Sequence, residues 1–161
     1  MIEPLRLSFE VACSASHAFD VWTARTALWW PASHTVSAQP DLQVLFEPSA
    51  GGRIFERTAD GREVDWGEIL AWEPPHRLVY LWHLRVDRAD ATEVEIRFQP
   101  VGDETTQVDI EHRGWDRLGT DARARRDANA GGWASLLPHF VAACRRDAVP
   151  EASVSLSDGS E

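Results

Sequence analysis

Six short strand-like segments follow one another between residues 42 and 112, and this run constrains the fold more than any other feature of the sequence. The segments are 42–47, 53–58, 63–72, 77–86, 92–99 and 106–112. In most of them apolar and polar residues alternate, which is typical of strands with one face on a core and the other in water. Short turns rich in Gly, Pro and Asp separate the segments and leave no room for crossover helices. We therefore expect consecutive antiparallel strands rather than βαβ units.

One strand and two short helices are expected before this run. Residues 5–11 alternate between apolar and polar side chains, which predicts a half-buried strand. Ser14 then stands at the N-cap position of a helix whose apolar residues, at helical spacing, end with Trp22. Residues 28–30 predict a second short helical piece, which Pro31 ends.

A long amphipathic helix is expected after the run. Apolar residues recur at the spacing of one helix face: Trp133, Leu136, Leu137, Phe140, Val141 and Cys144. Pro138 lies within this pattern and predicts a kink or a late helix start. The charged, Ala-rich residues 116–130 indicate either a solvated helix or a loosely ordered connection. We expect one domain over residues 1–149 and a disordered tail over residues 150–161.

Arginine supplies all 16 basic residues, because the sequence contains no lysine. This excludes lysine-anchored Schiff bases, and with them pyridoxal phosphate and lysine-dependent aldolase chemistry. It also excludes a P-loop nucleotide site, which needs a lysine on the phosphates. The 26 acidic residues give a formal net charge of −10. Nucleic-acid binding is not expected, since the phosphate backbone would repel such a chain.

No pattern in the sequence indicates a metal, a cofactor or a membrane segment. Cys13 and Cys144 lie far apart, and neither a CxxC nor an HxxxH motif occurs, so we expect no metal site and no cofactor. The two cysteines are interpreted as small core residues. The first residues lack the basic and apolar regions of a signal peptide, and no apolar run approaches the ~18 residues that a membrane span needs. We therefore expect a cytoplasmic protein.

Tryptophan is unusually frequent, with eight residues against a single tyrosine. Two interpretations are open at this point. The rings are either scattered through core and surface, or they line a cavity for an apolar ligand.

The order of these elements resembles the helix-grip fold of the START-related and pollen-allergen-like superfamily, often called SRPBCC. Several local motifs resemble the branch named for activators of the heat-shock chaperone ATPase. These motifs are Ser14–Thr23, Pro48–Arg53, Gly67–Ile69, Glu73–Leu78, Thr106–His112, Gly114–Trp115 and Gly131–Trp133. The resemblance as a whole covers roughly residues 3–148. The resemblance implies an α+β fold in which a curved antiparallel sheet (order β-α-α-β6-α) wraps around the long C-terminal helix.

The resemblance also implies what such a protein binds. Members of this superfamily hold lipids, polyketides or hormones in an apolar cavity between sheet and helix, and some catalyse cyclisation or dehydration there. The founding activators work with a chaperone, but their domain accompanies a separate N-terminal domain that this sequence does not show, so chaperone contact is not expected. The expected partner is a small apolar molecule, with no nucleic acid and no membrane insertion. A homodimer is left open.

His112 is the first candidate for chemistry in that cavity. It shares a strand face with Val108 and Ile110, so its side chain is expected to point into the core. An inward histidine is either a hydrogen-bonded structural group or a general acid or base in an apolar pocket, and the sequence leaves both readings open.

Glu68 is the second candidate. Simple alternation in residues 64–72 points Glu68 inward, whereas the family resemblance points Ile69 inward. A bulge near Gly67 would reconcile the two and leave Glu68 exposed. If Glu68 did face inward, its pKa would rise through desolvation, and it would form with His112 the one plausible acid–base pair.

Three hypotheses follow. The first is a binding protein for a small hydrophobic or aromatic ligand, the second a cyclase- or dehydratase-type enzyme that uses His112, and the third a chaperone partner. The expected cavity residues are Phe55, Trp66, Tyr80, Trp82, Val94, Ile96, Phe98, His112, Trp133, Leu137 and Phe140.

Overall fold

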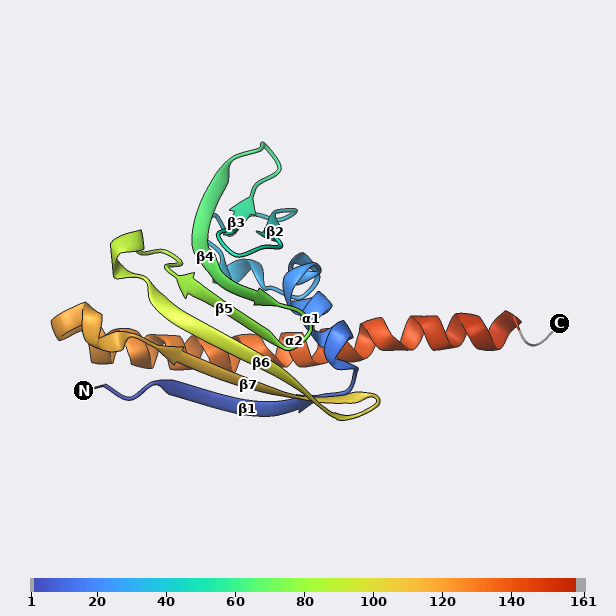
Figure 1. The fold of residues 1–161 in the computed structure, drawn as a ribbon. Helices are drawn as coiled ribbons and strands as arrows, with labels where there is room; N and C mark the ends of the chain where they lie inside the picture. Colours follow the sequence, from blue (N-terminus) through green and yellow to red (C-terminus); the bar gives the residue numbers. More distant parts are fainter. Residues whose placement is uncertain (1, 159–161) are drawn as a thin grey trace.

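The computed structural model describes residues 2–158, with side chains as far as Arg145, and it confirms the α+β helix-grip fold (Figure 1). The strands are β1 Leu5–Val11, β2 Gln43–Phe46, β3 Arg53–Arg57, β4 Glu63–Glu73, β5 Arg77–Trp82, β6 Thr92–Gly102 and β7 Thr105–Arg113. The helices are α1 Ala15–Thr23, η1 Thr26–Leu28, η2 Ala32–His34, η3 Arg88–Asp90, η4 Trp115–Asp121 and α2 Ala122–Asp158. Within the described residues, none of these helices combines the length and apolarity that a membrane crossing requires.

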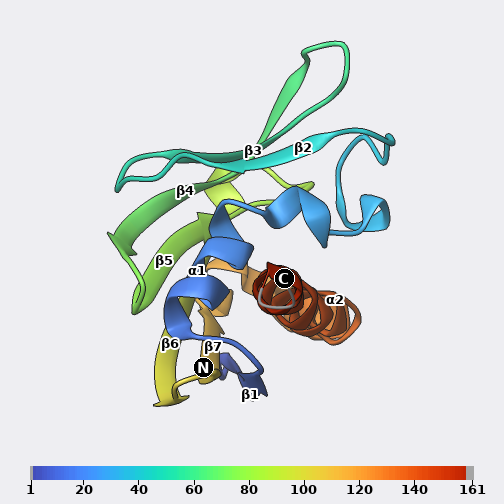
Figure 2. The same ribbon diagram turned by 90° about the vertical axis from the view of Figure 1, so that its right-hand side faces the viewer.

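All seven strands form one antiparallel sheet in the order β1-β7-β6-β5-β4-β3-β2. The meander from β2 to β7 is the one that the alternating segments predict. β1 closes the far edge by pairing with β7, with Leu5 opposite His112 and Val11 opposite Thr106. Figure 2 looks along α2 and shows the sheet curled around it, with α1 and the η1–η2 segment beside it. The apolar stripe of α2 is thereby buried against the concave face of the sheet.

Two local predictions about the chain are confirmed. Ser14 caps α1, since its hydroxyl accepts a hydrogen bond from the His17 amide at 3.2 Å. The bulge near Gly67 is present, because the pairing of β3 with β4 shifts by one residue between Ile54 and Phe55. Gly67 permits this close approach, as a Cβ atom there would lie 2.0 Å from the Leu81 carbonyl oxygen.

Some boundaries differ from the sequence prediction. β5 ends at Trp82 instead of continuing to residue 86, and Arg85 just beyond it has a left-handed backbone with φ of 65°. α2 begins at Ala122 and passes through Pro138 without ending, so the prediction of a late helix start is wrong. The expected domain boundary at residue 149 and the expected tail over residues 150–161 stay predictions. The side chains of residues 150–161, and residues 159–161 altogether, lie outside the described part of the chain.

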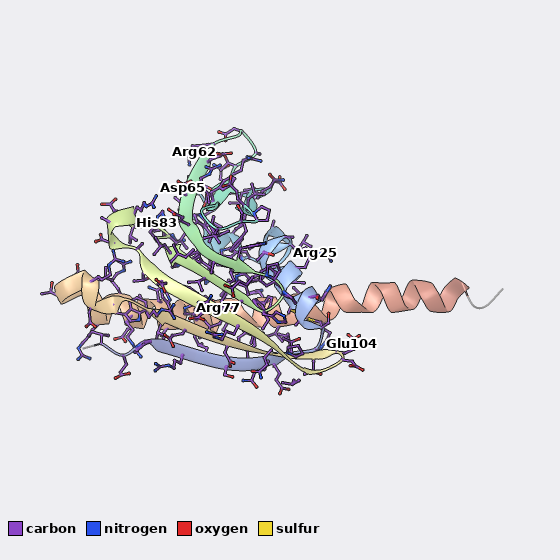
Figure 3. The ribbon with its side chains drawn as sticks, in the orientation of Figure 1. Arg25, Arg62, Asp65, Arg77, His83 and Glu104 are labelled. Carbon is purple, nitrogen blue, oxygen red and sulfur yellow. The ribbon has the colours of Figure 1, made fainter. Side chains whose placement is uncertain are left out.

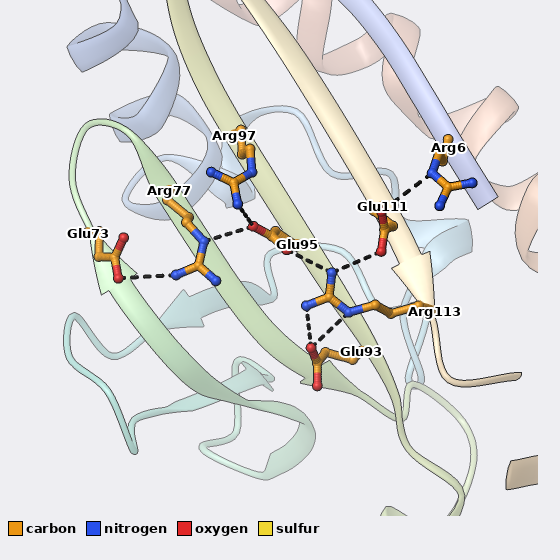
Figure 4. Close-up of polar contacts among 8 residues, drawn as sticks. All are labelled: Arg6, Glu73, Arg77, Glu93, Glu95, Arg97, Glu111 and Arg113. Atoms are coloured by element: carbon orange, nitrogen blue, oxygen red, sulfur yellow. Dashed lines mark hydrogen bonds and ion pairs between the residues drawn. The ribbon is translucent and has the colours of Figure 1, made fainter. Parts of the chain in front are cut away.

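The convex face of the sheet carries a network of arginine and glutamate side chains (Figure 4). Glu95 on β6 lies at its centre, with guanidinium nitrogens of Arg77, Arg97 and Arg113 at 2.8, 2.6 and 2.7 Å. Burial opposes ionisation of Glu95, but the hydrogen bonds from Arg77 and Arg113 and the neighbouring charges outweigh it and lower its pKa to about 2. Forked guanidinium groups can bridge several carboxylates, which lysine cannot do in the same geometry. These ion pairs satisfy the charged side chains of the convex face, while the apolar residues of the sheet pack on its concave face.

Candidate ligand-binding site

Aromatic rings fill most of the space between the sheet and α2. Trp22 of α1 is completely buried, and its ring centroid lies 4.8 Å from Phe140, 5.2 Å from Trp29 and 6.1 Å from Trp133. Trp22, Trp29 and Phe140 are called the packed cluster below. Since edge-to-face and offset contacts are the favourable arrangements of such rings, this part of the interior is a tightly packed core.

His112 is part of this interior and is hydrogen-bonded at both ring nitrogens. Trp133 donates its indole N–H to Nδ1 of His112 at 3.0 Å. An indole can only donate, so Nδ1 is an acceptor and the imidazole proton lies on Nε2. Nε2 then donates to the Thr92 hydroxyl at 2.6 Å. His112 therefore fixes the orientation of the Trp133 ring.

The protonation of His112 is equally constrained. Burial, with a smaller contribution from the charge of Arg125, lowers its pKa to about 3. The imidazole is thus neutral at physiological pH and a weak base. Its ring also packs on Trp115, with centroids 4.4 Å apart, and no face of it is exposed to solvent. These contacts favour the structural reading of His112 over the acid–base one.

A cavity of about 240 Å³ remains where β5 ends beside the first half of α2. We call it the aromatic cavity. Its main lining residues are Trp30, His34, Trp82, Arg85, Asn129 and Trp133. The rings of Trp30 and Trp82 lie 5.8 Å apart, and Trp66 packs behind both of them. Gly132 on α2 also lines the cavity, and a Cβ atom there would meet nothing within 4 Å.

Ten of the eleven expected cavity residues are divided between three places. Trp82 and Trp133 line the aromatic cavity. Most of the others are buried in the surrounding core: Trp66, Tyr80, Val94, Ile96, Phe98, His112 and Phe140. Leu137 belongs to a separate groove between β1 and α2. Burial raises the pKa of Tyr80 well above its ordinary value, so its hydroxyl stays neutral.

Phe55 and Glu68 lie away from the cavity. The Phe55 ring is covered by the guanidinium groups of Arg53 and Arg57, at 4.0 and 5.5 Å from its centroid, and it lies outside the apolar core cluster. Phe55 shares the strand face of these arginines, so the structure does not bring it to the cavity as expected. Glu68 pairs with Arg88 on the outside of the sheet, so the structure does not bring it to His112.

The buried carboxylate of this region is Glu56, which the sequence did not single out. It is fully buried on β3 and accepts hydrogen bonds from the Trp66 indole at 2.8 Å and from the Val36 and Ser37 amides at 2.7 and 3.0 Å. Burial alone would raise the pKa of Glu56, but these hydrogen bonds outweigh it and hold the pKa below its ordinary value. Glu56 therefore ties the segment after η2 to the aromatic interior.

The rim residues Trp30, His34, Arg85 and Asn129 were also missed. Trp30 and His34 lie on the short η1–η2 segment and Arg85 in a turn, where no hydrophobic periodicity marks a residue as inward. Asn129 was detectable, because it lies one helical turn before Trp133 on the same face of α2. Among the described residues, no three His, Cys, Asp or Glu side chains gather closely enough to hold a metal ion.

Comparison with known proteins supports the family that the motifs indicated. Residues 12–144 match the model of the family described as "Activator of Hsp90 ATPase homolog 1-like protein". A solved structure described as an anthrahydroquino-gamma-pyrone synthase, Txn09, complexed with SUM is 40% identical, with a TM-score of 0.56, over 76% of this chain and 84% of that one. The self-sacrificing resistance protein CalC from Micromonospora echinospora is 27% identical, with a TM-score of 0.67, over 90% and 96% of the two chains.

An Hsp90 activator from Plasmodium falciparum is 18% identical, with a TM-score of 0.50, over 70% of this chain and 73% of that one, and shares the fold alone. No curated protein gives a significant match. The family match covers most of the chain, and the 40% identical synthase covers three quarters of it. The chain therefore belongs to the family of activator of Hsp90 ATPase homologue 1-like proteins.

Proposed function

We propose that this protein binds a small, flat aromatic molecule in the aromatic cavity. The observation that carries the proposal is the set of three indole rings, Trp30, Trp82 and Trp133, around one unfilled space of about 240 Å³. Ligand sites are typically concave, lined by aromatic side chains and supplied with a few polar groups, here His34, Arg85 and Asn129. The volume is just below the usual range of about 300–1,000 Å³ for drug-sized ligands. A planar ligand of two or three fused rings suits this space.

The comparisons agree with a ligand of this kind. The 40% identical relative is named as a synthase of an anthrahydroquino-pyrone, which is a fused-ring compound, and its structure is a complex. That name describes the relative, and we extend only the chemical class of the ligand to this chain.

A cyclase-type enzyme is the second candidate, and the name of the same relative favours it. The surroundings of His112 argue against that residue as its general base, because both ring nitrogens are engaged and its pKa is about 3. Mass spectrometry of a bound compound before and after incubation separates the candidates. An enzyme changes the mass or the isomer of the compound, whereas a binding protein returns it unaltered.

The glycine pair of α2 provides the test of the binding proposal. Gly132→Leu places a side chain in the aromatic cavity, whereas Gly131→Leu places the same side chain on the exposed surface of the helix. Isothermal titration with 2-naphthalenemethanol, a neutral planar probe, should show binding to the wild type and to Gly131→Leu. For Gly132→Leu we expect a loss of at least about tenfold in affinity. Equal affinity in all three proteins would rule the aromatic cavity out as the binding site.

A further inference from the structure

Arg85 is the charged residue at the edge of the aromatic cavity. Its guanidinium group is held by backbone carbonyls, with Nε 3.2 Å from the Thr35 oxygen and Nη2 at 2.6 and 2.8 Å from the Thr35 and Ser33 oxygens. The residue is exposed to solvent at the cavity mouth and has a left-handed backbone with φ of 65°. This conformation is unfavourable for a residue with a side chain. The hydrogen bonds to the Thr35 and Ser33 carbonyls hold the side chain in place.

The charge of Arg85 has no acidic partner in the described part of the chain. Its hydrogen bonds all go to neutral carbonyl oxygens, and among the described residues none accepts from Nη1. The arginines of the convex face differ, since Arg77, Arg97 and Arg113 each lie against carboxylates. Arg85 lines the aromatic cavity, and a guanidinium with N–H groups left over is suited to bind an anionic oxygen there.

The other polar residues of the rim do not compete for that role. Burial, with the nearby charges of Arg85 and His139, holds the pKa of His34 below its ordinary value, so His34 is neutral at physiological pH. The Asn129 amide nitrogen donates to the Arg125 carbonyl at 2.8 Å. Of the described residues that line the aromatic cavity, only Arg85 is thus charged at neutral pH.

The position of Arg85 is linked to the aromatic interior. The carbonyl groups that hold it belong to residues 33 and 35, and the next two amides of the same segment donate to the buried Glu56. Trp66, which backs the cavity wall, donates to the same carboxylate. Residues 33–37 are therefore held by Glu56 on one side and by Arg85 on the other. The guanidinium group of Arg85 is thus preorganised before a ligand binds.

From these contacts we infer that the ligand of the aromatic cavity is an acid, with a carboxylate or ionised phenol directed at the guanidinium group of Arg85. This inference rests on the proposed function and specifies its substrate class. The rings of the ligand lie between Trp30, Trp82 and Trp133, and its anionic oxygen meets Nη1. A local arginine is needed for such a ligand, because a chain of net charge −10 repels anions in general.

The test compares two probes of the same shape. 2-Naphthoate carries a carboxylate where 2-naphthalenemethanol carries a neutral hydroxymethyl group, and isothermal titration measures both. We expect the wild type to prefer naphthoate and Arg85→Gln to lose about three- to tenfold in naphthoate affinity, with the alcohol unchanged. Arg85→Lys keeps the charge without the fork and should retain part of the preference.

The matched control is Arg62→Gln, which removes the same charge from the exposed turn between β3 and β4 (Figure 3). It should leave both affinities unchanged, and melting curves confirm that each variant is folded. If the wild type binds both probes equally, or if Arg85→Gln keeps the preference, the assignment of Arg85 is wrong while the binding function stands. If the wild type binds neither probe, the proposed function fails, and this inference fails with it.

Discussion

The packed cluster and the aromatic cavity are built from the same kind of residue and do different things. In the packed cluster, Trp22 is fully enclosed by other rings. At the aromatic cavity, Trp30 and Trp82 also lie ring to ring, but one side of Trp82 is open to the unfilled space. Trp133 connects the two regions, since it stacks on Trp22 and lines the cavity. Indole rings thus form closed core in one region and the wall of an unfilled space in the other, depending on whether other rings close around each indole.

The largest expected effect separates these two roles. Trp22→Ala removes a fully buried ring from the packed cluster and should lower the free energy of unfolding by about 3–5 kcal/mol. Trp82→Ala removes a half-buried ring and should lower it by only about 1–2 kcal/mol, while abolishing most probe binding. Urea denaturation and titration with 2-naphthalenemethanol measure the two quantities. Similar losses of stability in both variants would show that the cavity wall is packed as tightly as the cluster.

The second prediction concerns the support beneath the cavity rim. Glu56→Gln replaces a carboxylate that accepts from three donors with an amide that has a single acceptor atom. We expect a loss of about 1–3 kcal/mol in the free energy of unfolding. Binding should weaken further than this loss explains, because the segment that holds Arg85 is released. Glu68→Gln, on the outside of the sheet, is the control and should change neither quantity appreciably.

The core and the cavity rim also differ in how much of their structure the sequence predicts. The meander and the cap at Ser14 were predictable, because each follows from a local pattern of apolar residues or of capping chemistry. The bulge at Gly67 also needed the family resemblance, which conflicted with simple alternation. Glu56 was not singled out: alternation puts it on the strand face of Ile54, but nothing in the neighbouring sequence supplies the donors that a buried carboxylate needs. Its hydrogen-bond donors, the Val36 and Ser37 amides, come from 20 and 19 residues earlier in the chain.

The cavity rim shows the same limit. Arg85 follows the end of β5, where the left-handed backbone turns the chain away from the alternation of the strand. Trp30 and His34 lie near single turns of 3₁₀ helix, which are too short for a hydrophobic period. Core positions are encoded by periodicity and were predicted, whereas these rim positions depend on contacts between distant segments.

The third prediction uses pH to examine the link between the two regions. His112 is neutral in the folded protein, with a pKa of about 3 against an ordinary value of 6.5. Between these values the unfolded chain binds a proton that the folded chain does not, so stability is complete above pH 6.5 and is lost as the pH falls toward 3. At pH 5 the loss from this group is about 2 kcal/mol.

Urea denaturation between pH 4.5 and 7.5 measures this dependence, a range chosen to avoid the carboxylates. Glu95, whose pKa is about 2 against 4.5, adds its own loss only as the pH falls below 4.5. His112→Gln has no titrating ring at this position and should show a flatter profile from a lower starting stability. An unchanged slope in that variant would mean that another group titrates in this window.

The smallest expected effect tests whether a glycine that borders the aromatic cavity lowers the stability of α2. Gly131 and Gly132 lie inside α2, where most other residues would stabilise the helix more, and a Cβ atom at either position meets nothing within 4 Å. Each glycine-to-alanine change should therefore raise the free energy of unfolding by about 0.5–1 kcal/mol. Only Gly132→Ala adds a methyl group to the cavity wall, so it should alter probe affinity while Gly131→Ala does not. Equal stability gains with unequal binding would show that the glycine at position 132 keeps the space open at the expense of helix stability.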